Sequence, residues 1–245
     1  MAETIKITEL FGANLAELLA SKISAEYPQF DADGFIRAVS AATEGQSYTR
    51  RIELIAEELC NFLPADYLDA LAILMRILGP ENPNETGMFT HFYWLMPVGK
   101  FVQLYGIDHF EESMVAIEEI TKRNTGEYAV RPYIRANPKA ALKKMTRWAT
   151  SDSFHLRRLA SEGLRPKLPW APKLEVFIDD PAPVFSLLEL LKEDPSKFVQ
   201  KSVANHLTDY LKVNPVPARA LIKEWRTSQH PSTQWIIKHA TRKIQ

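Results

Sequence analysis

The stretch "DPSKFVQKSVANHL", residues 194–207, carries the pattern that decides the fold. Its opening aspartate and proline are typical of a helix start, and its apolar residues recur at three- and four-residue spacing. Val199 is followed two positions later by Lys201 and, after two more, by Val203. We therefore expect an amphipathic helix that buries the two valines and turns the lysine away from the buried seam.

The same plan occurs twice more, in "DSFHLRRLASEG" (152–163) and in "HPSTQWIIKHATRKI" (230–244). The aliphatic positions of the three stretches are 43 and 37 residues apart. A period of ~40 residues built from paired helices is typical of HEAT-like repeats. The sequence predicts an all-α fold, a HEAT-like helical-repeat solenoid, in which one basic residue per repeat lines a concave surface suited to a phosphate backbone. These basic residues are Arg158, Lys201 and Lys238.

Helical periodicity also dominates the first half of the chain, but no clean repeat occurs there. We expect residues 1–115 to form an N-terminal helical region packed on the solenoid. Residues 116–245 would form the HEAT-like repeats that carry the active site, and the two parts would make one continuous domain. The stretch "GPENPNETG" (79–87) is the best loop candidate in the first part.

Prolines mark many of the expected helix starts. A polar residue followed by a proline, ahead of an apolar pattern, is typical of an N-cap with proline at the first helical position. Five such pairs in the second half predict short helices joined by short turns. The pairs are Asn137-Pro138, Asp180-Pro181, Asp194-Pro195, Asn214-Pro215 and His230-Pro231.

Charge is divided unevenly along a chain whose net charge is zero. Residues 1–120 hold 7 Lys+Arg and 19 Asp+Glu, a net charge of −12. Residues 121–245 hold 23 and 11, a net charge of +12. A basic half favours contact with phosphates, but an internal interface between an acidic and a basic half explains the division equally well.

Several classes of protein are disfavoured. Cys60 is the single cysteine, so no internal disulfide can form, and the first 20 residues lack the basic start and apolar run of a signal peptide. No apolar run approaches the ~20 residues of a membrane span. The six scattered histidines predict no metal site, and no glycine-rich loop predicts a bound cofactor. A cytoplasmic protein without metal or cofactor is the expectation.

Trp170 is the most informative single residue, because prolines at positions 166, 169 and 172 stiffen the backbone around it. It follows Glu162 by eight residues and lies near Arg165 and Lys167. A tryptophan here could plug the next helix. It could also offer a stacking surface for a nucleobase, above all a cationic one.

Carboxylates recur in basic surroundings. Arg158 and Glu162 are spaced to pair on one helix face, which by itself indicates a weak surface ion pair. Glu127 lies four residues from both Arg123 and Arg131. Asp209 is placed opposite an apolar stripe. Single acids on basic helices are usually salt-bridge partners, but three of them on adjacent repeats near one tryptophan favour a functional site.

Four stretches resemble the bacterial DNA alkylation repair proteins of the AlkC/AlkD type, which are HEAT-like DNA glycosylases, and most closely the AlkC branch. The resemblance covers roughly residues 10–245. The stretches are "LPADYLDALAILMRILGP" (63–80), "ITKRNTGEYAVRPYI" (120–134), "HLRRLASEGLRPKLPWAPKL" (155–174) and "FVQKSVANHLTDYLKVNP" (198–215).

The resemblance implies hydrolytic excision of cationic N-alkylated bases, such as 3-methyladenine and 3-methylcytosine, from double-stranded DNA by a monomer. Glu127, Glu162 and Asp209 would be the catalytic acids. The residues implied in binding DNA or substrate are Trp170, Arg158, Arg123, Arg131, Arg165, Lys167, Lys201 and Lys238.

The chain also departs from the family pattern. Asn124 stands where an aromatic or aliphatic residue is common, and Gln200 and Ile237 replace common basic residues. We expect the last two changes to weaken the grip on DNA. Some relatives carry an additional C-terminal Ig-like domain, which these 245 residues do not include.

Two other functions fit the same sequence. A non-catalytic HEAT-like scaffold that binds nucleic acid or protein would tie its acids into salt bridges and bury Trp170 as a plug. An RNA-binding repeat protein would prefer single-stranded RNA to duplex DNA.

Overall fold

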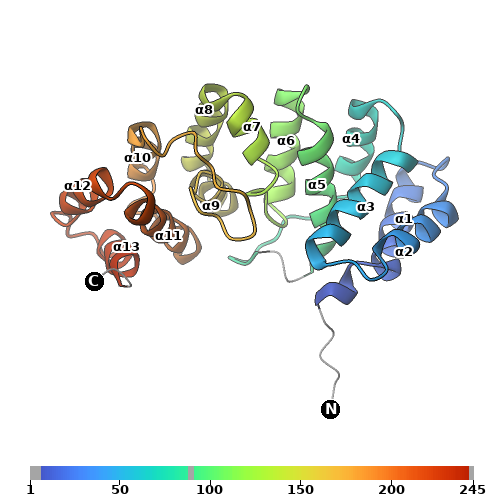
Figure 1. The fold of residues 1–245 in the computed structure, drawn as a ribbon, viewed down its shortest axis with the longest axis horizontal. Helices are drawn as coiled ribbons and strands as arrows, with labels where there is room; N and C mark the ends of the chain where they lie inside the picture. Colours follow the sequence, from blue (N-terminus) through green and yellow to red (C-terminus); the bar gives the residue numbers. More distant parts are fainter. Residues whose placement is uncertain (1–6, 88–90, 243–245) are drawn as a thin grey trace, which may run out of the picture. The chain divides into compact units, whose positions relative to one another are not determined.

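A computed structural model describes residues 7–87 and 91–242, and every regular element within these ranges is a helix (Figure 1). The all-α prediction is therefore confirmed. The described residues up to Asn82 and from Gly87 to Asn124 form one compact unit, unit 1. Pro83–Thr86 and the residues from Thr125 onward form a second, unit 2. Over the described residues, no helix combines the length and apolar character that a membrane span requires.

Unit 1 is a stack of amphipathic helices in which α1 packs on α2, α2 on α3, α3 on α5 and α5 on α6. Its core combines fully buried leucines on α1 and α3 with buried phenylalanines, among them Phe11, Phe35 and Phe101. The expected loop at residues 79–87 is confirmed. The elements are η1 (Ile7–Leu10), α1 (Ala13–Glu26), α2 (Ala32–Thr43), α3 (Tyr48–Phe62), α4 (Tyr67–Arg76), η2 (Tyr93–Leu95), α5 (Met96–Tyr105) and α6 (Phe110–Thr121).

Unit 2 contains the repeats. Helix α11 packs along α9 on one side and α13 on the other, and α8, α10 and α12 complete the repeats (Figure 1). The elements are α7 (Arg131–Ala136), α8 (Pro138–Ala149), α9 (Phe154–Glu162), α10 (Ala182–Glu189), α11 (Lys197–Val213), α12 (Pro215–Trp225) and α13 (Pro231–Thr241).

The repeat anchors are buried as the sequence pattern predicts. On α11, Val199 and Val203 are fully buried while Lys201 is exposed. The equivalent aliphatic and small positions on α9 and α13 are also buried, which places the same seam between successive helices. These positions are Leu156 and Ala160, and Ile236 and Ala240.

Three of the five expected proline starts coincide with observed helix starts, at Pro138, Pro215 and Pro231. Helix α10 begins one residue later than expected, because Pro181 occupies the N-cap. Helix α11 begins two residues later, because the carboxylate of Asp194 is engaged by Arg157 at 2.6 Å and Ser196 caps the helix instead.

The expectation that Gln200 and Ile237 weaken the grip on DNA stays a prediction, and the structure places both side chains in the protein interior. Gln200 is 2% exposed and donates to the Asp194 carbonyl at 2.7 Å and to Ser232 Oγ at 2.9 Å. Ile237 is also buried. Both side chains therefore belong to the packing between helices.

Gly163 allows the end of α9 to approach its neighbours closely. A Cβ at this position would lie 2.8 Å from Val130 Cγ1 and 2.9 Å from Met145 Cε. We expect Gly163→Ala to lower the free energy of unfolding by about 1–3 kcal/mol through overpacking. Urea denaturation would measure the loss, with Gly87→Ala as the control because a Cβ there meets nothing within 4 Å. Equal midpoints for the two variants would contradict the close approach.

Candidate active site

The three predicted acids lie in one chain of alternating charges in unit 2. Arg158 Nη1 is 3.3 Å from Glu127 Oε2, and Arg158 Nη2 is 3.7 Å from Glu162 Oε1. Arg165 Nη1 lies 2.6 Å from the same Glu162 oxygen, and Arg165 Nε lies 2.9 Å from Asp209 Oδ2. All three carboxylates are buried. We call these five residues the carboxylate–arginine cluster.

Three segments of the chain supply the cluster. Arg158, Glu162 and Arg165 have the spacing of one helical face, although Arg165 lies just beyond the end of α9. Asp209 is on α11, which packs against α9. Glu127 belongs to the irregular segment between α6 and α7. The cluster therefore depends on the packing of the first repeats of unit 2.

The expectation that Glu127 lies on a helix is wrong. Helix α6 ends before this residue and α7 begins after it, so the four-residue spacing to Arg123 and Arg131 does not bring them together. Arg123, in unit 1, donates to the Gly79 carbonyl at 2.7 Å and pairs with Glu119. Arg131 is buried and donates to backbone carbonyls.

The cluster shifts the pKa values of two of its acids in opposite directions. Burial alone would raise the pKa of Glu162, but Arg158, Arg165 and the Ser202 hydroxyl, which donates at 2.6 Å, outweigh it and lower that pKa. Burial raises the pKa of Asp209, and the attraction of Arg165 does not cancel this effect. Opposite shifts of this kind are how a site gives two carboxylates different roles.

The acids also differ in the use of their oxygens. Glu162 binds both arginines through Oε1 and accepts from Ser202 through Oε2. Among contacts with the described residues, Asp209 is held through Oδ2 and Glu127 through Oε2. One oxygen of each of these two carboxylates therefore remains available to a water molecule or a cation. With three carboxylates and two guanidinium groups, the ionised cluster has a net charge of −1.

Trp170 is not a plug. Its side chain is 85% exposed, and its φ of +63° is the only positive φ at a non-glycine among the described residues. Ala171 N donates to Leu168 O at 3.3 Å, so residues 168–171 form a β-turn with Pro169 second and Trp170 third. In a type II turn the third position takes a positive φ and favours glycine. The chain thus adopts a strained conformation that exposes an indole.

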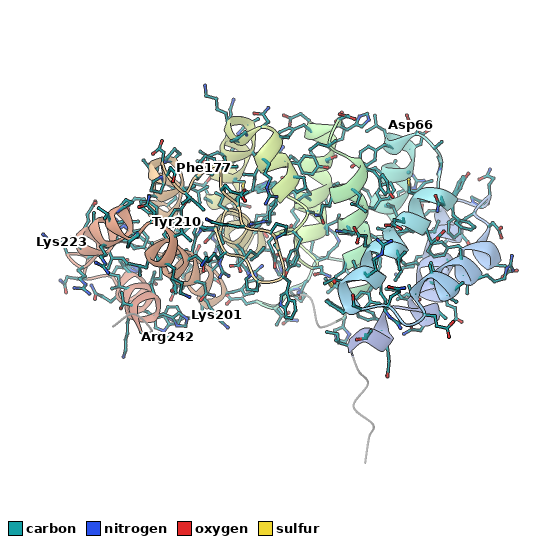
Figure 2. All side chains as sticks on the ribbon, viewed as in Figure 1. Asp66, Phe177, Lys201, Tyr210, Lys223 and Arg242 are labelled. Carbon is teal, nitrogen blue, oxygen red and sulfur yellow. The ribbon has the colours of Figure 1, made fainter. Side chains whose placement is uncertain are left out.

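The remaining predicted basic residues are on the surface of unit 2. Lys167 is exposed in the segment of residues 165–172 that carries Trp170, which we call the tryptophan loop. Lys201 (labelled in Figure 2) and Lys238 are exposed on the adjacent helices α11 and α13. Arg158 occupies the equivalent position on α9, but it is half-buried in the cluster. The expected row of three basic side chains therefore consists of two exposed lysines and one cluster arginine.

Sequence reasoning missed two members of the site. Ser202 donates to Glu162, and the guanidinium of Arg158 lies 4.6 Å from the ring centroid of Phe198. Ser202 precedes Asp209 by seven residues, two helical turns, so the helical period could have placed both on the same face of α11. The contact of Phe198 with Arg158 has no local signal because it arises from packing between helices.

The fold and site define a HEAT-like repeat protein with an arginine-braced acidic site and an exposed indole. Residues 102–244 match the family model described as DNA alkylation repair enzyme. The chain belongs to this family. It is 34% identical over 239 residues to the uncharacterized protein YhaZ of Bacillus subtilis (strain 168), covering 97% of this chain and 64% of YhaZ.

Two solved structures are similar. One is the Pseudomonas fluorescens alkylpurine DNA glycosylase AlkC bound to DNA containing an abasic site analog, with 34% identity and a TM-score of 0.87. The match covers 98% of this chain and 64% of AlkC, so the chain spans less than two thirds of both relatives. The other is smu.31 from Streptococcus mutans UA159, with 20% identity and a TM-score of 0.51. The match covers 94% of this chain and 100% of smu.31, and at this identity it supports the fold alone.

Proposed function

We propose that the protein is a monofunctional DNA glycosylase that hydrolyses the N-glycosidic bond of cationic alkylated bases, such as 3-methyladenine and 3-methylcytosine, in double-stranded DNA. The observation that carries the proposal is the cluster that joins Glu127, Glu162 and Asp209 through two arginines. The similarity to AlkC, an alkylpurine DNA glycosylase, supports it. We expect the protein to act as a monomer in the cytoplasm.

The chemistry needs negative charge and an oriented water. Alkylation at a ring nitrogen makes the base positively charged, so it departs as a neutral molecule when the bond from C1′ breaks and the electron pair passes to the base. Asp209, with a raised pKa and an available oxygen, accepts the proton of the water that attacks C1′. Glu127 stabilises the positive charge that develops on the sugar. Glu162 holds the two arginines in place.

The exposed indole supplies recognition. A cation is attracted to the face of a tryptophan ring. The exposed Trp170 therefore binds a methylated, positively charged base more tightly than a neutral one. Lys167, Lys201 and Lys238 are exposed and would contact phosphates. Arg123 and Arg131 are engaged with the protein's own backbone, so we assign them no phosphate.

The decisive assay measures free base released from duplexes that each hold one defined methylated base. We expect release from 3-methyladenine or 3-methylcytosine duplexes, with an abasic site left behind, and none from an undamaged duplex of the same sequence. A duplex with 7-methylguanine is included so that the rates of release of the three methylated bases can be ranked. Binding to all duplexes without release from any would refute the glycosylase and favour the non-catalytic scaffold, for which the ion-paired acids are the supporting observation.

A further inference from the structure

Arg131 lies under the loop that carries Trp170. Its guanidinium donates from Nη1 to the carbonyls of Gly163 at 3.3 Å and Arg165 at 2.9 Å, and from Nη2 to the carbonyl of Pro172 at 2.6 Å. One planar group thus bridges the two ends of the segment between residues 165 and 172.

No carboxylate of the described residues lies within ion-pair distance of Arg131, although its side chain is only 2% exposed. Burial lowers its pKa to about 10, and the positive charge of Arg135 adds to the effect. A buried cation without an anion is costly. Here the three carbonyls compensate it, and the rigid fork of arginine can reach all of them at once.

The bridged segment needs an external restraint. The indole of Trp170 is exposed, so packing does not hold the residue at its φ of +63°. The Leu174 N to Pro166 O bond at 3.0 Å closes the loop, and Tyr128 Oη donates to Pro169 O at 3.4 Å. Arg131 makes the most bonds across the base of the loop, and it makes them where the chain enters and leaves it.

We propose that Arg131 is a positioning residue that fixes the tryptophan loop so that Trp170 is presented ready to stack on the substrate base. The proposal rests on the proposed function for its catalytic consequence, but the restraint on the loop is independent of activity. Arg131 therefore acts on the reaction through Trp170 and touches neither substrate nor DNA.

The test compares Arg131→Lys with wild type by hydrogen exchange and by base release. A lysine keeps the charge but cannot bridge three carbonyls. We expect peptides covering residues 163–174 to exchange faster while those of α13 are unchanged. We expect base release by Arg131→Lys to fall about tenfold. Both a higher half-saturating DNA concentration and a lower maximal rate should contribute, and Trp170→Ala should show the same two changes. In the double variant the two losses should not add.

The control is Arg157→Lys, because Arg157 also donates to backbone carbonyls, but these belong to Ser151 and Asp152, which precede α9 and lie outside the tryptophan loop. Its exchange changes should stay outside residues 163–174, and its effect on base release should add to that of Trp170→Ala. Unchanged exchange at 163–174 in Arg131→Lys, or additive losses with Trp170→Ala, would overturn the proposal. Absence of base release in wild type would refute the glycosylase, while the exchange result would still decide whether Arg131 holds the loop.

Discussion

Asp209→Asn is expected to lower the single-turnover rate of base release by about 10²–10⁴-fold, the usual contribution of a positioned general base. Asn keeps the shape and can still accept from Arg165, but it cannot take a proton from water. The folded-state pKa of Asp209 is raised, so its favourable contribution to stability is present at low pH and lost as pH rises through that pKa. At neutral pH the ionised side chain of Asp209 therefore makes no favourable contribution to stability. Replacing it with Asn should leave the free energy of unfolding nearly unchanged.

Glu162→Gln provides the contrast. It leaves Arg158 and Arg165 in a buried cluster without their shared anion, which should lower the free energy of unfolding by about 3–5 kcal/mol at pH 7. The folded-state pKa of Glu162 is lowered, so its contribution is present above the unfolded pKa and lost as pH falls through the folded one. The difference from wild type should therefore shrink in acid.

Urea denaturation at several pH values and the pH profile of base release check both results. The acid limb of the wild-type profile should lie above the range of an ordinary aspartate and disappear in Asp209→Asn, because it reports the ionisation of that residue. If Asp209→Asn releases base at the wild-type rate, or if its pH profile keeps the acid limb, Asp209 is not the base.

The repeat fold could be predicted because its signals are local. The buried anchors of α11 and the proline starts of α8, α12 and α13 each follow from a few neighbouring residues. The position of Glu127 could not be predicted in this way. The helical spacing rule assumes a continuous helix, whereas the chain turns between α6 and α7, and tertiary packing brings Arg158 to this acid.

Arg131 illustrates a second limit. A basic residue in a basic half of the chain indicates a phosphate contact, and the sequence carries no sign that the carbonyls of a later loop would enclose it. Trp170 was ambiguous for a different reason. The prolines around it indicate a stiff loop, but they do not say on which side of that loop the indole lies.

Trp170→Gly is expected to separate activity from stability. Removal of the indole should lower base release by about 10–100-fold, the usual worth of one base–aromatic stack. Because the side chain is 85% exposed, little packing is lost. Glycine also accepts the φ of +63°, a conformation that costs other residues about 1–2 kcal/mol.

Trp170→Ala is the matched control, because alanine removes the indole but keeps the backbone strain. We expect the two variants to lose the same activity, with the glycine variant more stable by about 1 kcal/mol, or roughly 2–4 °C in Tm for a chain of this size. If Trp170→Gly releases base at the wild-type rate, the indole has no role in the reaction. Equal stability of the two variants would contradict the strain. If both expectations hold, this turn retains a tryptophan at a position that suits glycine because the exposed ring serves the reaction and not the fold.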